Sequence, residues 1–521
     1  MLAGLSSGNT ASRRSYFSRY ENPILLFVLC IIVIAVLTIL RGIFAGLIDL
    51  RVDEAYYWTW SKESVVSFLD HPPMIAWCVR FGTLIFGDTN LGVRFTGLLA
   101  MPLMQLILAD IVWRTLRDFR YVAIVVLLPE AAPDYGFLMA KVAPDTALIP
   151  FALAMVWSLV RLALSGDLRW WLPAGVFAGL ALLSKYTAVL LFPAILAFAL
   201  VPEWRTKQLS SPYPWLAALI ALVIFSPVLY WNATHDWVSF KFQLDRPEQL
   251  HGWSAKFLLD FAGQQFALVG TLLLPVVLIG TSMLAWRGYR TSEPISILLS
   301  TCVIFPLSFL IWRSFHSRIG DSWPLFIWPF GFAAAAINLK SWRQEAPASS
   351  MTKVAPAILS GLILVVAILI YYIAGHANYL GKNDPIGKEA GFAGVVQAAD
   401  EAAGKVGATF FATTDYRMYS MLRWHLKDRI PVVQINERNR YIDFNTREKA
   451  FAGPVGLYVG PKDDPIMQLW KKTNATLEPV GDVDLTWRGV RYDTYSLQKL
   501  TGWKPLLSPP PGDPFYRGSP H

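Results

Sequence analysis

Acidic, basic and aromatic side chains gather in a few short segments between long apolar runs. The first segment contains Asp53 and Glu54, with Tyr56 close behind, and ends with Asp70 and His71. A carboxylate placed there could accept a proton from an attacking hydroxyl group or orient that group. The later segments add Lys141, Asp145, Lys185, Tyr186, His235, Arg313, His316 and Arg318. This set predicts one site, at one end of the apolar runs, that takes a lipid headgroup and acts on it in water.

Each of these residues also has a simpler interpretation. The Asp53–Glu54 pair could be interfacial charges, and His71 could cap a turn beside two prolines. Asp145 follows a proline at the start of an apolar run, which suits a helix N-cap. Lys185 is flanked by long apolar runs, where an unpaired amine is costly, so we expect it to have a partner such as a phosphate. Tryptophans that fit an interfacial aromatic belt better than a sugar-binding platform are Trp231, Trp237, Trp253 and Trp323.

The composition places these segments in a membrane protein. The 521 residues are 54% hydrophobic and only 16% charged, whereas a soluble domain carries roughly 25% charged residues. A cytosolic enzyme, a disordered protein and a coiled coil are therefore excluded. The net charge of +9 does not indicate nucleic acid, because a membrane protein concentrates Lys and Arg in its inward loops. Three isolated cysteines exclude a disulfide framework and a Cys-ligated zinc site, and we expect them to pack in the interior.

The apolar runs predict about eleven transmembrane helices, since only helices satisfy their own backbone in lipid without closing into a barrel. The fifth and sixth could instead be one long helix with a re-entrant break. The candidate spans are 24–42, 91–113, 121–138, 146–163, 170–184, 186–201, 214–231, 266–286, 294–312, 323–338 and 354–374.

The loop charges predict the orientation and the domain limits. Lys and Arg are about twice as dense in one alternate set of connections as in the other, which makes the denser set cytoplasmic. We therefore expect a cytoplasmic tail (1–22), which leads into an uncleaved anchor, and a transmembrane domain with periplasmic loops (23–375). A small periplasmic α/β domain (376–500) follows, with strands at GATFFAT, PVVQI, VGLYVG and VRYDTYSLQ, and then a Pro-rich disordered tail (501–521).

Several ordered motifs in residues 20–340 resemble one family. They are DEAYYW, DHPP, a Pro-Asp pair before the fourth span, GLALLSKYTAVLL, PVLYWNATHDWVSFKFQ and SWP. As a set they resemble the bacterial GT-C membrane glycosyltransferases of families 39 and 83. This group includes the protein O-mannosyltransferases, the lipid A aminoarabinose transferase and the lipopolysaccharide galacturonosyltransferases.

The resemblance implies transfer of a sugar from a polyprenyl-phosphate donor to a lipopolysaccharide, lipid A or protein acceptor. The reaction would take place at the periplasmic face of the bacterial inner membrane. Asp53 matches the family's catalytic carboxylate, with Glu54 beside it, and Asp145 matches a second acidic position. Tyr56 and His71 stand where the aminoarabinose enzyme has Arg and Lys, so other cations must meet the donor phosphate. The predicted substrate-binding residues are Tyr56, Asp70, His71, Lys141, Lys185, Tyr186, His235, Arg313, His316 and Arg318.

A polyprenyl phosphate is a good leaving group once its developing charge is stabilised, so little covalent help is expected. Asp53 would act as a base, or would only orient an acceptor that is itself a phosphate. No cofactor is expected, although Asp53, Glu54, Asp70 and Asp145 could hold a divalent cation. Two alternatives are a flippase for a lipid-linked sugar and a non-catalytic envelope assembly subunit. A flippase should show polar residues near mid-bilayer and repeated halves, and the sequence shows neither.

Overall fold

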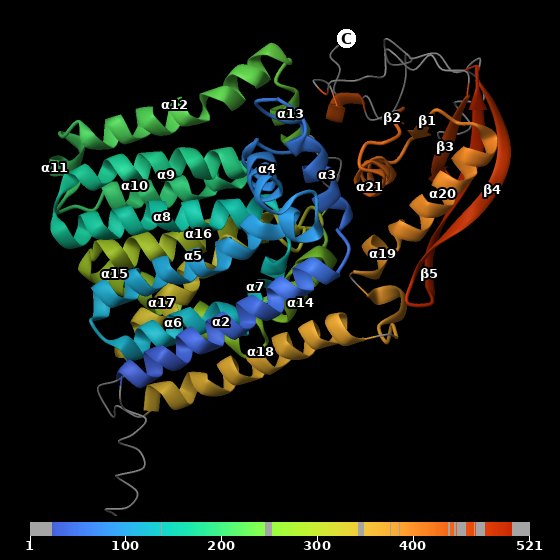
Figure 1. The fold of residues 1–521 in the computed structure, drawn as a ribbon. Coiled ribbons are helices and arrows are strands. Elements are labelled where there is room, and N and C mark those ends of the chain that lie inside the picture. The colour runs from blue at the N-terminus through green and yellow to red at the C-terminus, as the bar shows by residue number, and fades with distance from the viewer. Residues whose placement is uncertain are drawn as a thin grey trace, which may run out of the picture.

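Long helices lie side by side in a bundle, and a small domain with a curved sheet stands at one end of it (Figure 1). This computed structural model describes residues 23–136, 138–244, 253–341, 349–375, 377–384, 386–435, 438–441, 444, 455–462, 464 and 475–502. The predicted tail 1–22 and all but two residues of the predicted tail 501–521 lie outside the described residues.

Helices occupy all eleven predicted spans, but fewer are long enough to cross a membrane alone. Among the described residues, six helices are sufficiently long and apolar, or seven if α14 and α15, bent by 102°, form one span. The six are α2 (Pro23–Leu47), α5 (Asn90–Leu116), α8 (Pro144–Ser165), α12 (Tyr213–Thr234), α16 (Pro294–Ser314) and α18 (Ser349–Ala374). The others are α6 (Phe119–Ala131), α9 (Trp171–Ser184), α10 (Phe192–Ala199), α14 (Ala255–Val269), α15 (Leu273–Thr291) and α17 (Trp328–Ser341).

The fifth and sixth spans are two helices separated at Lys185. Helix α9 ends at Ser184, and Lys185 is extended, with φ −159° and ψ 140°. A 3-10 segment (Tyr186–Leu191) leads into α10, which returns to the short α11 (Arg205–Leu209) at the other end of the bundle (Figure 1). The break therefore places Lys185 at the end of the bundle that faces the sheet.

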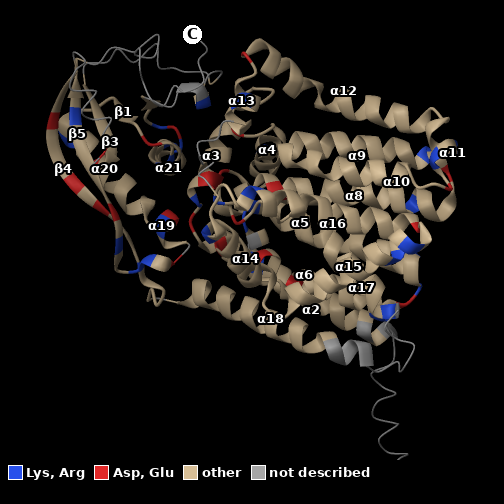
Figure 2. Ribbon diagram, turned by 180° about the vertical axis from the view of Figure 1, so that it is seen from behind, with Lys and Arg blue, Asp and Glu red and all other residues tan. Residues whose placement is uncertain are grey.

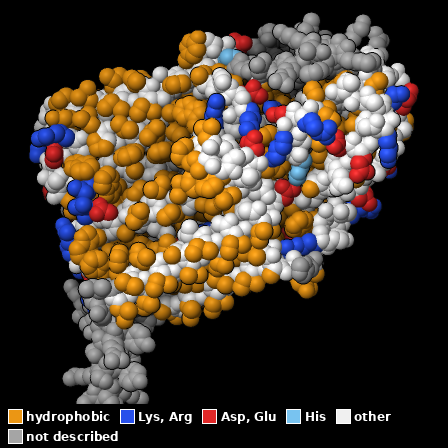
Figure 3. Space-filling view, in the orientation of Figure 1, with side chains coloured by type: hydrophobic (Ala, Val, Ile, Leu, Met, Phe, Trp, Pro, Cys, Tyr) orange, Lys and Arg blue, Asp and Glu red, His pale blue; other side chains and the backbone are white. Residues whose placement is uncertain are grey.

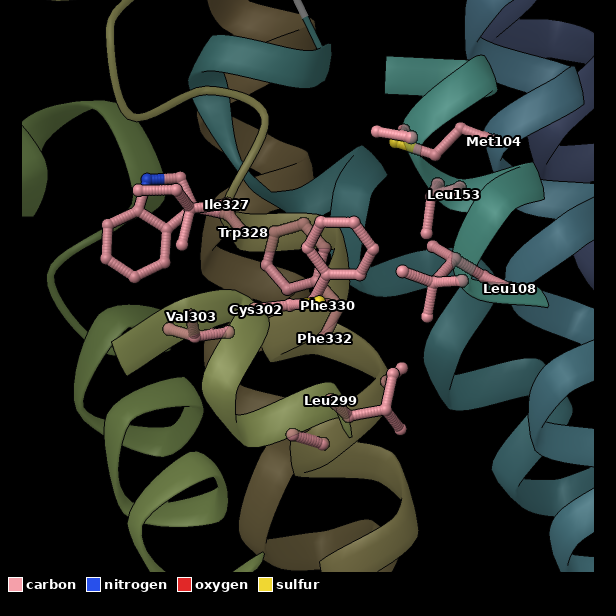
Figure 4. Packing of buried hydrophobic residues seen from close by; sticks show 14 of the residues in the cluster. Met104, Leu108, Leu153, Leu299, Cys302, Val303, Ile327, Trp328, Phe330 and Phe332 are labelled. Carbon is pink, nitrogen blue, oxygen red and sulfur yellow. The ribbon is translucent and has the colours of Figure 1, made fainter. Parts of the chain in front are cut away.

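Interlocking apolar side chains fill the centre of the bundle. Figure 4 shows Met104 and Leu108 of α5 and Leu153 of α8 facing the aromatic rings of Phe330 and Phe332 on α17. Cys30 and Cys302 are buried in the same core and Cys78 is half-buried, all three as free thiols, which confirms the packing role expected for them.

One buried ion pair joins three helices of the bundle. The Arg41 guanidinium on α2 donates to both carboxylate oxygens of Glu130 on α6, at 2.6 and 3.1 Å. Gln105 on α5 donates to the same carboxylate at 2.9 Å. Both charged side chains are at most 1% exposed. Both charged groups of the pair thus have hydrogen-bond partners, which an ion pair in an apolar interior requires.

The segment between α2 and α5, here called the first external segment, is folded rather than a loop. It forms α3 (Val52–Ser61) and α4 (Met74–Phe86) at the end of the bundle nearest the sheet (Figure 1). A short α7 (Pro133–Gly136) and α13 (Val238–Leu244) lie at this end as well.

The C-terminal domain contains a five-stranded mixed sheet of order β2-β1-β3-β5-β4. Its strands are β1 (Phe410–Thr413), β2 (Val432–Gln434), β3 (Val455–Pro461), β4 (Thr476–Trp487) and β5 (Val490–Thr501), and its helices are α19 (Gly387–Ala390), α20 (Phe392–Val406) and α21 (Tyr416–Leu426). Strands β1 and β2, and β1 and β3, run parallel, whereas β5 is antiparallel to both β3 and β4. The predicted mixed α/β fold is confirmed, with β4 as an additional strand.

Charged side chains mark both ends of the bundle. Lys and Arg gather at the end remote from the sheet, around α11, while acidic and basic residues mix near α3 (Figure 2). Hydrophobic side chains cover the surface between these ends (Figure 3). The chain is a multi-pass membrane protein, and an apolar band between two polar ends is what lipid contact requires.

Candidate active site

A cavity of about 830 Å³ opens at the end of the bundle nearest the C-terminal domain. Its wall is built from α3, the segment before α8, the break at Lys185, α14, α18 and the chain that follows α18. The predicted site residues that line it are Asp53, Glu54, His71, Lys141, Asp145, Lys185 and Tyr186. Segments far apart in sequence thus meet in one place.

Asp53 presents a carboxylate to this cavity. It stands in the first turn of α3, where the positive end of the helix dipole favours a negative charge. Its side chain is exposed to the cavity, and its one hydrogen bond to a described residue is a long contact of 3.5 Å from the Tyr416 hydroxyl. Enclosure by protein raises the pKa of Asp53, and the neighbouring Glu389 carboxylate raises it further.

Glu54 belongs to the same cavity wall, but its carboxylate is turned toward α5, and both of its oxygens accept hydrogen bonds. Its side chain is 1% exposed, and Arg94 of α5 donates to both oxygens at 2.9 and 2.6 Å. The backbone amides of Arg51 and Val142 donate to the same carboxylate at 2.9 and 3.0 Å. Burial opposes the charge, but Arg94 holds the pKa of Glu54 below its ordinary value. Glu54 therefore positions α3 and the segment 141–143 rather than meeting a substrate.

Lys185 has the partner that its apolar flanks predict, and that partner is Asp145. The Lys185 ammonium donates to Asp145 Oδ2 at 2.7 Å, and the two side chains are 9% and 3% exposed. Asp145 is the second residue of α8 rather than its N-cap, which is Ala143. The other oxygen, Oδ1, is buried without a hydrogen-bond partner in the described part of the chain. The pair thus holds α8 and the end of α9 together and leaves one acceptor unused.

Lys141 is the cation of the site that has no direct partner. It makes no hydrogen bond or salt bridge to any residue that the structure describes, and it faces the cavity. Burial lowers the pKa of Lys141, and the adjacent Arg51 lowers it further. Its backbone fits closely against Gly97 of α5, where a Cβ would lie 2.2 Å from the Lys141 carbonyl oxygen. An amine held in this way is well placed to bind an anion.

Sequence reasoning missed further charged groups of the wall. Arg51 lines the cavity, and its guanidinium donates to both oxygens of Glu389 at 2.6 and 2.8 Å. Asp134 and Asp321 also line it, and neither has a salt bridge within the described ranges. Arg51 stands two residues before Asp53, and this position beside the motif is the sequence signal that could have identified it as a site residue. Nothing in the sequence pointed to Glu389.

Asp70 lies behind the cavity wall and binds two neighbours. It accepts from the Tyr56 hydroxyl at 2.9 Å and from Arg440 of the C-terminal domain at 2.5 Å. Burial opposes the charge of Asp70, but Arg440 lowers its pKa below the ordinary value. His71 lines the cavity beside the ring of Tyr57. Tyr56 and Asp70 thus contact the C-terminal domain rather than the cavity.

Besides Tyr56 and Asp70, four predicted substrate-binding residues lie outside the residues that line the cavity, namely His235, Arg313, His316 and Arg318. His235 stacks on Trp231 with ring centroids 4.4 Å apart, and Arg318 is exposed. Trp231 is buried and Trp323 lines the cavity, so neither fits a lipid-facing belt, whereas Trp237 and Trp253 are 45% and 75% exposed.

Three of the four carboxylates considered for a divalent cation form ion pairs, and only Asp53 does not within the described residues. Glu54 binds Arg94, Asp70 binds Arg440, and Asp145 binds Lys185. Within the described ranges, no group of three or more His, Cys, Asp or Glu side chains is arranged to hold a metal ion.

An apolar wall completes the cavity. It consists of Ala267 and Leu268 of α14 and Leu364, Ala367 and Ile368 of α18. Leu364 lines the cavity and is 46% exposed. The cavity therefore combines charged groups with an apolar wall on two helices of the bundle, which suits a headgroup joined to a hydrocarbon chain.

Comparison with known proteins finds similarity to glycosyltransferases over part of the chain. Residues 70–231 match the family model described as dolichyl-phosphate-mannose-protein mannosyltransferase. The lipid A galacturonosyltransferase RgtD of Rhizobium johnstonii is 27% identical over 256 residues, which cover 46% of this chain and 50% of that protein. The undecaprenyl phosphate-alpha-4-amino-4-deoxy-L-arabinose arabinosyl transferase 1 of Sodalis glossinidius is 25% identical over 256 residues, covering 46% and 44%. The chain thus spans about half the length of the curated relatives it matches.

The fold has a counterpart among solved structures. The crystal structure of ArnT from Cupriavidus metallidurans bound to undecaprenyl phosphate matches with a TM-score of 0.62 and 13% identity, covering 91% of this chain and 97% of that one. This likeness includes the bundle and the C-terminal domain, and at this identity it concerns the fold alone. With its family match, its relatives and its fold, the chain is related to the GT-C membrane glycosyltransferases of the dolichyl-phosphate-mannose-protein mannosyltransferase type.

Proposed function

We propose that this chain transfers a sugar from a polyprenyl-phosphate donor to a lipopolysaccharide, lipid A or protein acceptor. The observation that carries the proposal is one cavity that combines an open carboxylate, two cations and an apolar wall formed by α14 and α18. Asp53 would activate or orient the acceptor, Arg51 and Lys141 would stabilise the leaving phosphate, and Leu364 with its neighbours would contact the polyprenyl chain. The sugars that the relatives' names mention, galacturonic acid and 4-amino-4-deoxy-L-arabinose, differ in charge. The identity of the sugar that this chain transfers is therefore left to experiment.

Each role follows from ordinary chemistry. Attack on the anomeric carbon breaks its bond to the phosphate oxygen, and the negative charge that develops there needs fixed cations in a site with little water. Arg51 and Lys141 supply these cations, and Asp53 takes the proton of an acceptor hydroxyl group. We further propose that the cavity faces the periplasm of a bacterial inner membrane, since the basic end of the bundle lies on the opposite side (Figure 2).

The test compares the envelope glycolipids of a deletion strain with those of the same strain carrying the wild-type gene. Intact-mass spectrometry of lipid A, core oligosaccharide, envelope proteins and polyprenyl-phosphate sugars should show loss of one sugar mass and accumulation of its donor. Complementation should restore both. Unchanged glycolipids, glycoproteins and donor pools in the deletion strain would contradict the transferase and favour the assembly-subunit alternative.

Replacing Lys141 by Met should weaken binding of undecaprenyl phosphate about 10- to 100-fold, because a hydrogen bond to a charged group contributes about 1.5–3 kcal/mol. The measurement is the Kd for undecaprenyl phosphate of purified protein in detergent. Lys405→Met, at an exposed site near the end of α20, is the matched control and should leave the Kd unchanged. An unaltered Kd in Lys141→Met would remove Lys141 from the phosphate site.

The pH dependence of transfer should be bell-shaped. Activity requires ionised Asp53, whose raised pKa sets the acid limb of kcat/KM above the ordinary Asp value of 3.8. It also requires protonated Lys141, whose lowered pKa sets the alkaline limb below 10.5. Lys141→Arg should move the alkaline limb upward, because a guanidinium stays protonated. If that limb does not move, another group controls it.

A further inference from the structure

The contact between Arg51 and Glu389 joins the predicted phosphate site to the C-terminal domain. Glu389 lies on α19, 338 residues after Arg51, and the two groups form a bidentate pair at 2.6 and 2.8 Å. The side chains are 28% and 27% exposed, so water reaches the pair. A guanidinium presents the same fork to a phosphate as to a carboxylate. Glu389 therefore occupies the position that a phosphate on Arg51 would take.

The charges around the pair favour such an exchange. Lys141 lies near Arg51 and lacks a direct partner in the part of the chain that the structure describes. Glu389 in turn lies near the carboxylate of Asp53, which it repels. A phosphate on Arg51 and Lys141 would replace an anion that pairs with one cation by an anion that pairs with two.

We propose that Glu389 is a displaceable counter-ion of Arg51, which the donor phosphate expels when it binds, releasing α19 from the first external segment. This inference rests on the proposed function for the identity of the anion. The exchange changes no covalent bond. It makes donor binding and the α19 contact compete for one guanidinium.

The release is local to the contact between α19 and Arg51. Helices α3 and α21 share an apolar core in which the rings of Trp58 and Trp424 lie 5.3 Å apart. Arg440 and Asp70 add an ion pair between the same parts of the molecule. Helix α19 is four residues long, and its Ala390 is buried in an apolar cluster with residues of α2 and α18. The domain can therefore stay docked while the Glu389 side chain leaves Arg51.

The first experiment is a double-mutant cycle on the Kd for undecaprenyl phosphate, measured with the full-length protein. Glu389→Gln should tighten binding about threefold to fivefold, the range of a partly exposed ion pair. Arg51→Gln should weaken binding, and adding Glu389→Gln to it should have no further effect. Glu478→Gln is the matched control, since Glu478 pairs with Lys499 on the sheet and should leave the Kd unchanged.

A second measurement needs no variant. Undecaprenyl phosphate added to the wild-type protein should speed backbone hydrogen exchange in Gly387–Ala390 and leave Tyr416–Leu426 unchanged. Slower or unchanged hydrogen exchange in α19 would overturn the inference while the proposed function stands. A Kd that is unchanged or higher in Glu389→Gln would do the same. Absence of undecaprenyl phosphate binding in the wild-type protein would overturn the proposed function, and the inference with it.

Discussion

Replacing Asp53 by Asn is expected to reduce sugar transfer about 10²- to 10⁴-fold, the usual contribution of a general base. The carboxylate is open to the cavity and makes one long hydrogen bond, from Tyr416 at 3.5 Å. Asn has the same shape but cannot take the proton of an acceptor hydroxyl group. Because the native Asp53 carries no short ion pair, its loss should leave expression and melting temperature unchanged.

The measurement is initial-rate transfer with purified donor and acceptor, together with thermal unfolding of the same preparations. Asp88→Asn is the matched control, because Asp88 binds Lys62 and Trp58 outside the cavity. It should retain transfer. Full activity in Asp53→Asn would overturn the catalytic role, and in cells it would favour the flippase or the assembly subunit. A loss below tenfold, with a phosphate as acceptor, would assign Asp53 to orientation alone.

The two adjacent acids show how far a sequence motif can be interpreted. The motif identifies Asp53 and Glu54 together, and both occur where the site was expected. Consecutive residues of a helix point about 100° apart, so one faces the cavity and the other faces α5. The direction of each depends on Arg94, which lies 40 residues after Glu54 in the sequence. No local pattern contains that information.

Apolar patterning predicted the bundle well because spans are long and continuous. It overlooked α3 and α4, whose 10 and 13 residues are too short to stand out. It also omitted β4, which contains Pro479 and Gly481 and is mostly exposed at the edge of the sheet, so it lacks alternating burial. Local residue patterns identify an element only where most of its length is buried on one side.

Contacts between distant segments could not be predicted. Lys185 was expected to need a partner, and a phosphate was the natural candidate, yet the fold supplies Asp145 from 40 residues away. The C-terminal domain similarly brings Glu389, Tyr416 and Arg440 to the first external segment. Membrane topology allowed these residues to share one face, and the pairs themselves depend on tertiary packing, such as that of α8 on α9 and of α21 on α3.

Replacing Glu54 by Gln is expected to lower the free energy of unfolding by about 3–5 kcal/mol, because it leaves the buried Arg94 guanidinium uncompensated. Arg94 also donates to the carbonyls of Ala45, Ile48 and Asp49 at 2.9, 2.5 and 2.8 Å, so the guanidinium cannot swing out to water without breaking them. Thermal unfolding and the monodisperse fraction after size exclusion report the loss. Wild-type protein should keep this stabilisation above the ordinary Glu pKa of 4.5 and lose it as pH falls through the lowered pKa.

The double variant Glu54→Gln, Arg94→Met separates an uncompensated charge from lost packing. Removing both charges should recover part of the stability, since a buried pair replaced by neutral groups often costs little. Transfer should stay low in the recovered protein, because Gln offers one acceptor oxygen for the two backbone amides of Arg51 and Val142, and the segment that carries Lys141 is held less firmly. A stable Glu54→Gln single variant, or full transfer by the double variant, would contradict a positioning role. Replacing the two adjacent acids should thus have different effects. Asp53→Asn should be folded and inactive, whereas Glu54→Gln should be unstable.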